Sequence, residues 1–176
     1  MKDAILTYFQ GEKHGGLAAA SVGFVSLVAA GLLSTPRAGA ELRPFAMALA
    51  VLGLLELAIG IGLYAKTGPQ LAELLARLES EPAAFYAAEG ARMAKVQKNF
   101  VTLEVFWCVL LAGGSITAVL AKRSPTPSGI AAALVLTAGF FLTFDLVAER
   151  RGAIYYAALR EPSTKAPVIK RNPHDP

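Results

Sequence analysis

The 176-residue chain has few of the side chains on which redox and metal centres depend, with one cysteine and two histidines. A single thiol, Cys108, excludes an intramolecular disulfide and a relay between thiols. His14 and His174 both lie outside the apolar runs of the chain, so a haem held between two histidines inside a membrane has no ligands. The sequence therefore predicts a protein without a redox cofactor or a metal centre.

Sequence motifs for catalysis are absent as well. The chain contains no Walker A loop, no GxGxxG dinucleotide-binding turn, and neither the HExxH nor the GxSxG motif. The positions of the two histidines also leave no place for a triad of serine, histidine and aspartate. We predict that the protein is not an enzyme.

Charged residues make up only 17% of the chain, and they leave four long apolar runs. Each run has about 20 residues, which is long enough to cross the hydrocarbon core of a bilayer as a helix. A soluble helical bundle is the weaker alternative, since a soluble chain of this size seldom has four such runs. The sequence predicts an all-α integral membrane protein with four transmembrane helices, at residues 17–34, 45–66, 101–121 and 129–148.

Lysine and arginine are distributed unevenly between the connecting segments. Of the 17 basic residues, 13 lie before the first run, between the second and third runs with Lys66 at the end of the second run included, or after the fourth run. Because basic segments stay on the cytoplasmic side, we expect both termini in the cytoplasm, with the chain in a bacterial-type inner membrane. The basic residues are spread along membrane-proximal segments, which predicts contact with anionic lipid and not with nucleic acid.

The beginning of the chain has two interpretations. Ala38, Gly39 and Ala40 resemble a signal-peptide cleavage site, but the apolar run before them is long and acidic residues precede it, which favours a retained helix. Residues 1–16 are then a cytoplasmic interfacial segment, with a short helix that ends where Gly15 and Gly16 break it. Two short periplasmic hairpins are predicted at residues 35–44 and 122–128.

The segment at residues 67–100 is the only sizeable soluble part of the prediction. Gly68 and Pro69 are expected to stop the second transmembrane helix, and an amphipathic helix with an apolar leucine stripe follows. A third helix can start at Pro82 and run without a break to about Ala121. Such a helix is about 60 Å long, about twice the hydrocarbon thickness, so its first half projects into the cytoplasm as a stalk.

The fourth helix is expected to leave the membrane in the same way. No proline appears before Pro162, so residues 149–160 can continue the helix into the cytoplasm. Residues 161–176 then form a basic tail rich in proline. The third and fourth helices therefore both extend beyond the bilayer.

The cytoplasmic extensions carry apolar side chains that need a partner. One possibility is a binding surface for another protein, made of Phe85, Met93, Val96, Ile154 and Tyr155. The alternative is packing within the chain as a small cytoplasmic bundle with the leucine stripe. In both cases Glu89 and Arg92, three residues apart, are expected to form an ion pair on the exposed side of the stalk.

Three carboxylates interrupt the apolar runs: Glu56, Glu104 and Asp145. An ionised side chain in hydrocarbon needs a partner, water or a proton. Glu56 lies about eleven residues from either end of its run, near the bilayer centre, whereas Glu104 and Asp145 lie level with each other near the cytoplasmic edge, within reach of basic residues. All three are candidate sites for an ion, a proton or an intersubunit polar contact.

Glu56 has two interpretations of its own. It is either neutral and hydrogen-bonded to a neighbour, or it lines a hydrated path. The candidate neighbours are Ser26, Ser115, Thr117 and Thr137. No lysine or arginine lies at the depth of Glu56, so a cationic partner must come from another subunit.

Two functions fit the sequence. The first is a non-enzymatic structural, accessory or regulatory membrane subunit, in a homo-oligomer or a larger membrane complex, which acts through helix packing in the bilayer and through its cytoplasmic helices. The alternative is a small oligomeric channel or a proton- or cation-coupled transporter. In that alternative Glu56 binds the ion, and Glu104 and Asp145 form a cytoplasmic vestibule.

Overall fold

The computed structural model describes residues 1–161, in which every long element is a helix. In chain order the elements are α1 (Lys2–Leu33), the short 3-10 helices η1 (Pro36–Ala38) and η2 (Ala40–Leu42), α2 (Arg43–Ser80), α3 (Pro82–Leu120) and α4 (Pro125–Arg160). The tail predicted at residues 161–176 falls outside the described residues from residue 162 onward.

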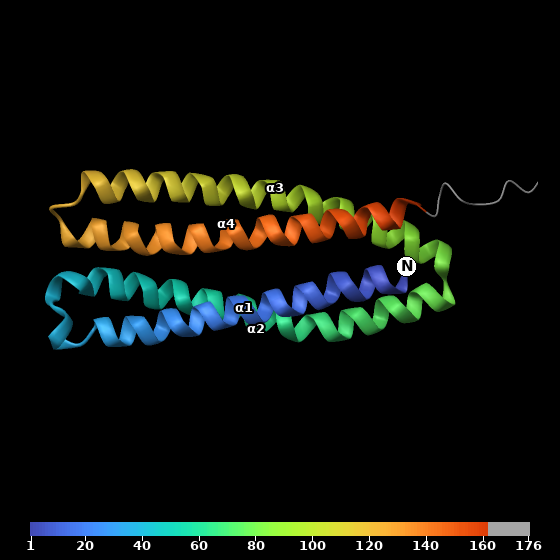
Figure 1. The fold of residues 1–176 in the computed structure, drawn as a ribbon, viewed down its shortest axis with the longest axis horizontal. Coiled ribbons are helices and arrows are strands. Elements are labelled where there is room, and N and C mark those ends of the chain that lie inside the picture. The colour runs from blue at the N-terminus through green and yellow to red at the C-terminus, as the bar shows by residue number, and fades with distance from the viewer. Residues whose placement is uncertain (162–176) are drawn as a thin grey trace, which may run out of the picture.

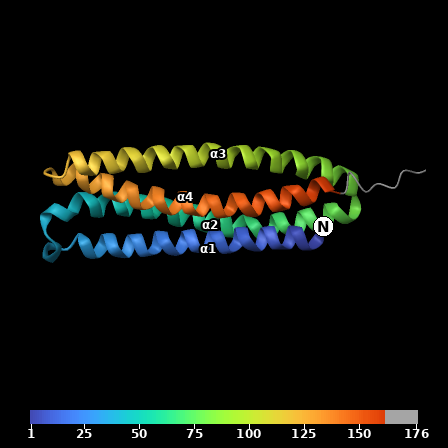
Figure 2. The same cartoon turned by 45° about the horizontal axis from the view of Figure 1, so that its top comes forward.

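The four α-helices form an elongated bundle of two antiparallel hairpins, α1 with α2 and α3 with α4 (Figure 1). Contacts between the hairpins come mainly from α2 and α4, while α3 packs chiefly on α4 (Figure 2). The start of α1, the end of α4 and the turn between α2 and α3 lie together at one end, the terminal end. η1, η2 and the turn between α3 and α4 lie at the opposite end, the loop end.

The helix boundaries follow from a few backbone positions. Pro82 begins α3 and Pro125 begins α4, where the missing N–H of proline costs no helical hydrogen bond. Glu81 alone separates α2 from α3. Between η1 and η2, Gly39 has a φ of 91°, a backbone conformation that side-chain-bearing residues rarely adopt.

The predicted all-helical architecture is confirmed for the described residues. All four α-helices are long and apolar enough to span a membrane, as predicted. The predicted long helices are also present: α3 runs unbroken from Pro82 to Leu120, and α4 continues to Arg160. With 39 residues, α3 is about 58 Å long, about twice the thickness of a hydrocarbon core.

The predicted break at Gly15 and Gly16 is wrong, since α1 continues through both residues. Gly16 lies where α1 touches the backbone of α2: a Cβ added to it would lie 2.9 Å from the carbonyl oxygen of Gly60. This close packing offsets the low helix propensity of glycine, which costs about 1 kcal/mol in a helix interior.

The predicted stop at Gly68 and Pro69 is also wrong, since α2 continues to Ser80. Pro69 removes one backbone hydrogen bond from the helix interior. The helix persists because its later part packs on α1, where Leu74 joins a core with residues from the start of that helix. Tertiary packing therefore outweighs the local effect of proline.

α1 and α2 meet through glycines spaced seven residues apart on each helix, Gly16 and Gly23 on α1 and Gly53 and Gly60 on α2. A Cβ added to Gly60 would lie 2.2 Å from the backbone nitrogen of Ala20, and one added to Gly23 would lie 2.4 Å from that of Leu57. The two backbones are therefore in direct contact, the arrangement by which small residues pack helices in lipid.

Gly60→Ala is expected to destabilise the protein by about 2 kcal/mol, because the added methyl group overlaps the backbone of α1 at Ala20. For a chain of this length, that loss lowers the melting temperature by about 4–8 °C. Gly62→Ala is the matched control, since Gly62 faces open space and alanine is the better helix former. Thermal unfolding followed by circular dichroism in mild detergent measures both variants. Equal melting temperatures would contradict the close contact.

Candidate functional site

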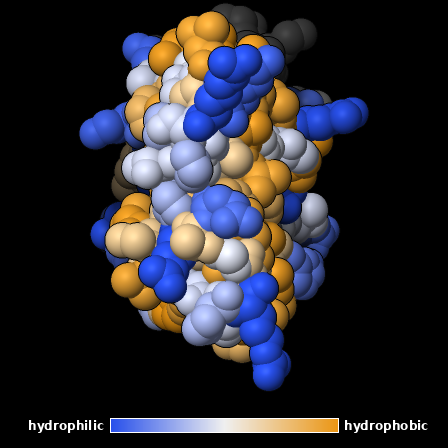
Figure 3. All heavy atoms as spheres, turned by 90° about the vertical axis from the view of Figure 1, so that its left-hand side faces the viewer, coloured by the Kyte–Doolittle hydropathy of each residue, from blue (hydrophilic) through white to orange (hydrophobic). Residues whose placement is uncertain are grey.

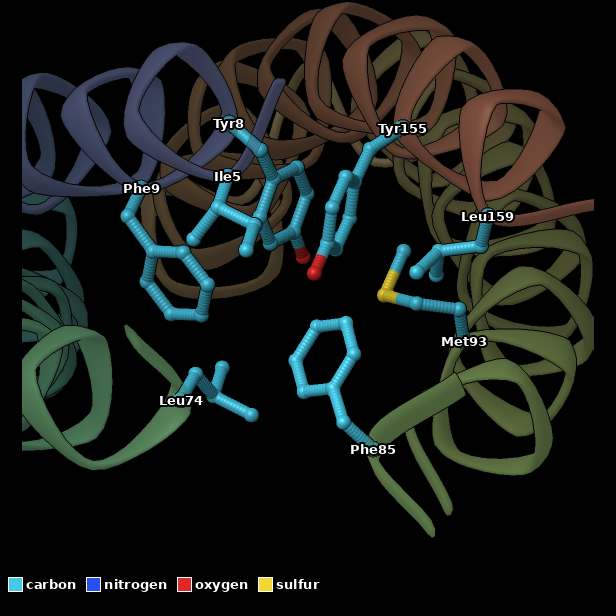
Figure 4. Close-up of a cluster of buried hydrophobic side chains, with 8 residues drawn as sticks. All are labelled: Ile5, Tyr8, Phe9, Leu74, Phe85, Met93, Tyr155 and Leu159. Atoms are coloured by element: carbon cyan, nitrogen blue, oxygen red, sulfur yellow. The ribbon is translucent and has the colours of Figure 1, made fainter. Parts of the chain in front are cut away.

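A core of large side chains fills the terminal end of the bundle, and all four helices contribute to it (Figure 4). Its buried members are Ile5, Tyr8, Phe9, Leu74, Phe85, Met93, Tyr155 and Leu159. Tyr8 of α1 stacks on Tyr155 of α4, with ring centroids 4.8 Å apart. The predicted leucine stripe of α2 joins this terminal core, because Leu71, Leu75 and Leu78 pack against it.

An ion pair lies at the terminal core, with the side chain of Glu89 buried and that of Arg92 34% exposed. The guanidinium of Arg92 donates two hydrogen bonds to the carboxylate of Glu89, at 2.7 and 2.6 Å. The Tyr155 hydroxyl donates a third to the same carboxylate, at 3.0 Å. The predicted pair therefore exists, but its predicted position on the exposed side is wrong, since Glu89 is only 2% exposed. The Tyr155 bond explains how this carboxylate is accommodated away from water.

Burial changes the acidity of the two stacked tyrosines. It raises the pKa of Tyr8 to about 12, and the nearby carboxylate of Glu12 adds to the effect. Burial also raises the pKa of Tyr155, and the negative charge of Glu89 acts in the same direction. Both hydroxyls therefore stay protonated over the physiological range, and the hydroxyl of Tyr155 serves as a hydrogen-bond donor to Glu89.

The five residues of the predicted partner surface have different surroundings. Phe85, Met93 and Tyr155 are buried within the terminal core, and Val96 is partly buried against it. Ile154 alone of the five is well exposed, at 67%. The terminal core thus matches the intramolecular alternative, a small bundle made by the chain itself. Three of the five side chains are packed inside this core and are not exposed to a partner.

Asp145 has a partner that the sequence did not suggest. The indole nitrogen of Trp107 on α3 donates a hydrogen bond to the Asp145 carboxylate on α4, at 2.7 Å. Trp107 also stacks on Phe141, with ring centroids 4.9 Å apart. The basic residues expected beside Asp145 make no ion pair with it among the described residues. The indole N–H of a tryptophan in an apolar run needs a hydrogen-bond acceptor, so the position of Trp107 in the third run could have indicated a nearby carboxylate.

Glu104 lies near Asp145, as predicted, and interacts electrostatically with Asp145 and Glu149 of α4. Its Oε1 atom is buried and has no hydrogen-bond partner within residues 1–161. The side-chain nitrogen of Gln97, one heptad earlier on α3, is in the same situation. The two carboxylates are therefore neighbours, and within residues 1–161 neither forms a salt bridge with a basic residue.

Glu56 is almost fully enclosed, with 2% of the residue exposed. The hydroxyl of Ser26 on α1 donates a hydrogen bond to its Oε2 atom, at 3.2 Å. Of the four predicted neighbours, Ser26 is thus the partner, and Thr137 lines the same groove. Ser115 and Thr117 instead bond to carbonyl oxygens of their own helix.

Glu56 is one of the residues that line a groove of about 380 Å³ between α1 and α4, which we call the Glu56 groove. Its other polar lining residues are Ser21, Ser26 and Thr137, and the rest are apolar side chains such as Val25 and Leu136. Among the residues that the structure describes, no lysine or arginine lines it. The arrangement offers a carboxylate hydrogen-bond acceptor beside the hydroxyl of Ser26, in a groove whose lining is otherwise mainly apolar.

Tyr155→Phe is expected to destabilise the terminal core by about 1.5–3 kcal/mol, because it removes one hydrogen bond to the buried carboxylate of Glu89. The stacking of the ring on Tyr8 is retained. Tyr156→Phe is the neighbouring control, and its expected change is below about 0.5 kcal/mol. Urea unfolding followed by far-ultraviolet circular dichroism measures the difference. A loss no larger for Tyr155→Phe than for Tyr156→Phe would show that this hydrogen bond does not stabilise the core.

Alkaline pH is expected to unfold the terminal core. Because the pKa of Tyr8 rises from 10.0 to about 12 in the fold, the unfolded chain releases this proton more readily. The contribution of Tyr8 to stability is therefore complete below pH 10.0 and disappears as the pH rises towards about 12. Ultraviolet absorbance of tyrosinate measures the titration. Tyr8→Phe should remove a component near pH 12, and a titration curve unchanged by this substitution would contradict the raised pKa of Tyr8.

The comparisons with known proteins give no match. No family model, no curated protein and no solved structure matches the chain. The functional proposals below therefore depend on the chain's own residues and contacts.

Proposed function

We propose that the chain is a non-enzymatic integral membrane protein that serves as an accessory or regulatory subunit of a membrane assembly. The observation that carries the proposal is the Glu56 groove. Its carboxylate is enclosed by α1, α2 and α4, receives one hydrogen bond from Ser26, and has no cation from residues 1–161 beside it in the groove. A carboxylate in this position is stabilised further by a donor from outside the chain.

The proposed partner is a transmembrane helix that carries a basic or hydrogen-bonding side chain at the depth of Glu56. The rim of the groove supports this, because Val25 and Leu136 expose apolar surface that a helix in lipid can cover. The hydroxyls of Ser26 and Thr137 add polar contacts beside the carboxylate. Hydrogen bonds between transmembrane helices contribute about 0.6–2 kcal/mol each, so the apolar contact and the carboxylate act together.

The terminal end has a supporting role in this proposal. Its core closes on itself around the Glu89–Arg92 pair, which makes the projecting helices a rigid unit. We place this unit in the cytoplasm, in a bacterial-type inner membrane, on the distribution of basic residues. The exposed side chain of Ile154 marks the part of this unit that is free to contact another protein.

Proton- or cation-coupled transport is the second candidate, and one observation favours it. Three hydroxyl-bearing residues, Ser21, Ser26 and Thr137, line the same groove as Glu56, and the hydroxyl of Ser26 donates a hydrogen bond to the Glu56 carboxylate. Such a set can bind a proton or a small cation. In this candidate Glu56 is the binding residue, and the chain functions as an oligomer.

Site-specific photo-crosslinking in native membranes tests the subunit proposal. A probe at Val25, on the rim of the Glu56 groove, should give a defined adduct with a membrane protein, and Glu56→Leu should reduce its yield about tenfold. Glu56→Gln should retain part of the yield, because the amide still forms hydrogen bonds. A probe at Val119, an exposed position of α3, is the control and should not give this adduct.

Two outcomes would overturn the subunit proposal. The first is a Val25 adduct whose yield is unchanged in Glu56→Leu. The second is a proton or cation flux through proteoliposomes that contain the purified chain alone, if Glu56→Gln abolishes the flux and Glu41→Gln does not. Glu41 is the control because it lies in η2 at the loop end, outside the groove. The second outcome would establish the transport candidate instead.

A further inference from the structure

Two apolar grooves run along α4 near the loop end, one on its α2 side and one on its α3 side. The first has a volume of about 530 Å³ and the second about 460 Å³. Both are lined by Ile130 and Leu134 of α4, so the two grooves adjoin each other along this helix. We call them together the double groove, and it is separate from the Glu56 groove on the other side of α4.

The length and lining of the double groove suit an acyl chain on each side of α4. On its α2 side it extends from Arg43 to Leu52, a rise of about 13 Å along the helix, close to the roughly 15 Å depth of one lipid leaflet. On its α3 side Gly113 faces open space, which leaves room that a larger side chain would fill. Almost all of the lining is apolar, and the polar exceptions, Arg43, Thr117 and Thr126, stand towards the loop end.

The charge of the loop end indicates the charge that the headgroup of such a ligand has. Four basic residues lie there, Arg37, Arg43, Lys122 and Arg123, against one acidic residue, Glu41. All four basic side chains are exposed or partly exposed, and none forms a salt bridge within the described part of the chain. Figure 3 shows this end, where hydrophilic side chains project among hydrophobic surface. An anionic group at the mouth of the double groove is therefore complementary in charge.

We propose that the double groove binds one phospholipid with two acyl chains and an anionic headgroup. The headgroup phosphate lies at Arg43, and the two chains lie on either side of Ile130 and Leu134. A zwitterionic lipid fills the same apolar space but leaves the excess positive charge uncompensated, so the anionic lipid binds more tightly. The inference rests on the proposed membrane insertion, and not on the role of Glu56.

Native mass spectrometry of the full-length protein in mild detergent tests the charge requirement. The probes are dioleoyl phosphatidylglycerol and dioleoyl phosphatidylcholine, added separately. We expect one retained phosphatidylglycerol per chain, bound several-fold more tightly than phosphatidylcholine. Arg43→Ala should weaken phosphatidylglycerol binding about fivefold. Arg37→Ala is the matched control, an exposed arginine at the same end that does not line the grooves, and should change the affinity much less.

A second pair of variants tests the shape of the site. Gly113→Leu should fill the α3 side of the double groove and abolish retention of the lipid, whereas Gly62→Leu, at another open glycine, should not. Melting temperatures equal to that of the unchanged protein confirm that both variants fold.

Three results would overturn the inference. The first is equal affinity for the two lipids, and the second is an unchanged phosphatidylglycerol affinity in Arg43→Ala. The third is that the protein forms a homodimer and no lipid complex, and that Gly113→Leu dissociates this homodimer. Alkaline carbonate extraction of membranes tests insertion separately. Release of the chain by carbonate would contradict membrane insertion. If the chain stays in the membrane but shows no lipid preference, only the lipid-binding inference is contradicted.

Discussion

The direct backbone contact between α1 and α2 is the constraint on which the apolar half of the bundle depends. It requires residues without side chains at four positions, and it also positions Glu56. Ser26 reaches the Glu56 carboxylate at 3.2 Å because Gly53 leaves the space in front of it empty: an added Cβ would lie 2.7 Å from the Cβ of Ser26. A larger residue there would separate the helices and leave the carboxylate without its hydrogen bond. The close packing of α1 on α2 and the hydrogen bond between Ser26 and Glu56 therefore depend on the same glycine.

The two ends of the bundle are held together by different forces. At the terminal end the helices are joined by large side chains, such as Phe85, Met93 and Tyr155, around the buried carboxylate of Glu89. In water the burial of such side chains is the main favourable term, whereas lipid offers no such gain and helices associate through close contact of small residues. The change in side-chain size along the same four helices is the pattern expected when one end lies in water and the other in a bilayer.

The sequence predicted the elements of this fold much better than their contacts. Run length and the prolines at residues 82 and 162 were enough for the number of long helices and for the extensions of α3 and α4, because these depend on local signals. The breaks predicted at Gly15 and Pro69 failed because packing between helices outweighed local propensity. The pairing of Trp107 with Asp145 depends on the register of α3 against α4, which no local pattern contains. For the same reason Ser26 could be named only as one of four neighbours of Glu56.

The two hairpins differ in how tightly they close, and this difference places both proposed binding regions beside α4. α1 and α2 touch along their glycines, while α3 and α4 are held by larger groups such as the ring of Trp107 on Phe141 and leave open space at Gly113. The double groove uses Leu134 of α4, and the Glu56 groove uses Leu136 and Thr137, less than one turn further along. A shift of α4 therefore changes both grooves together. If a lipid at one groove and a partner helix at the other favour different positions of α4, each changes the affinity of the other by the same factor, since coupling between binding sites is reciprocal.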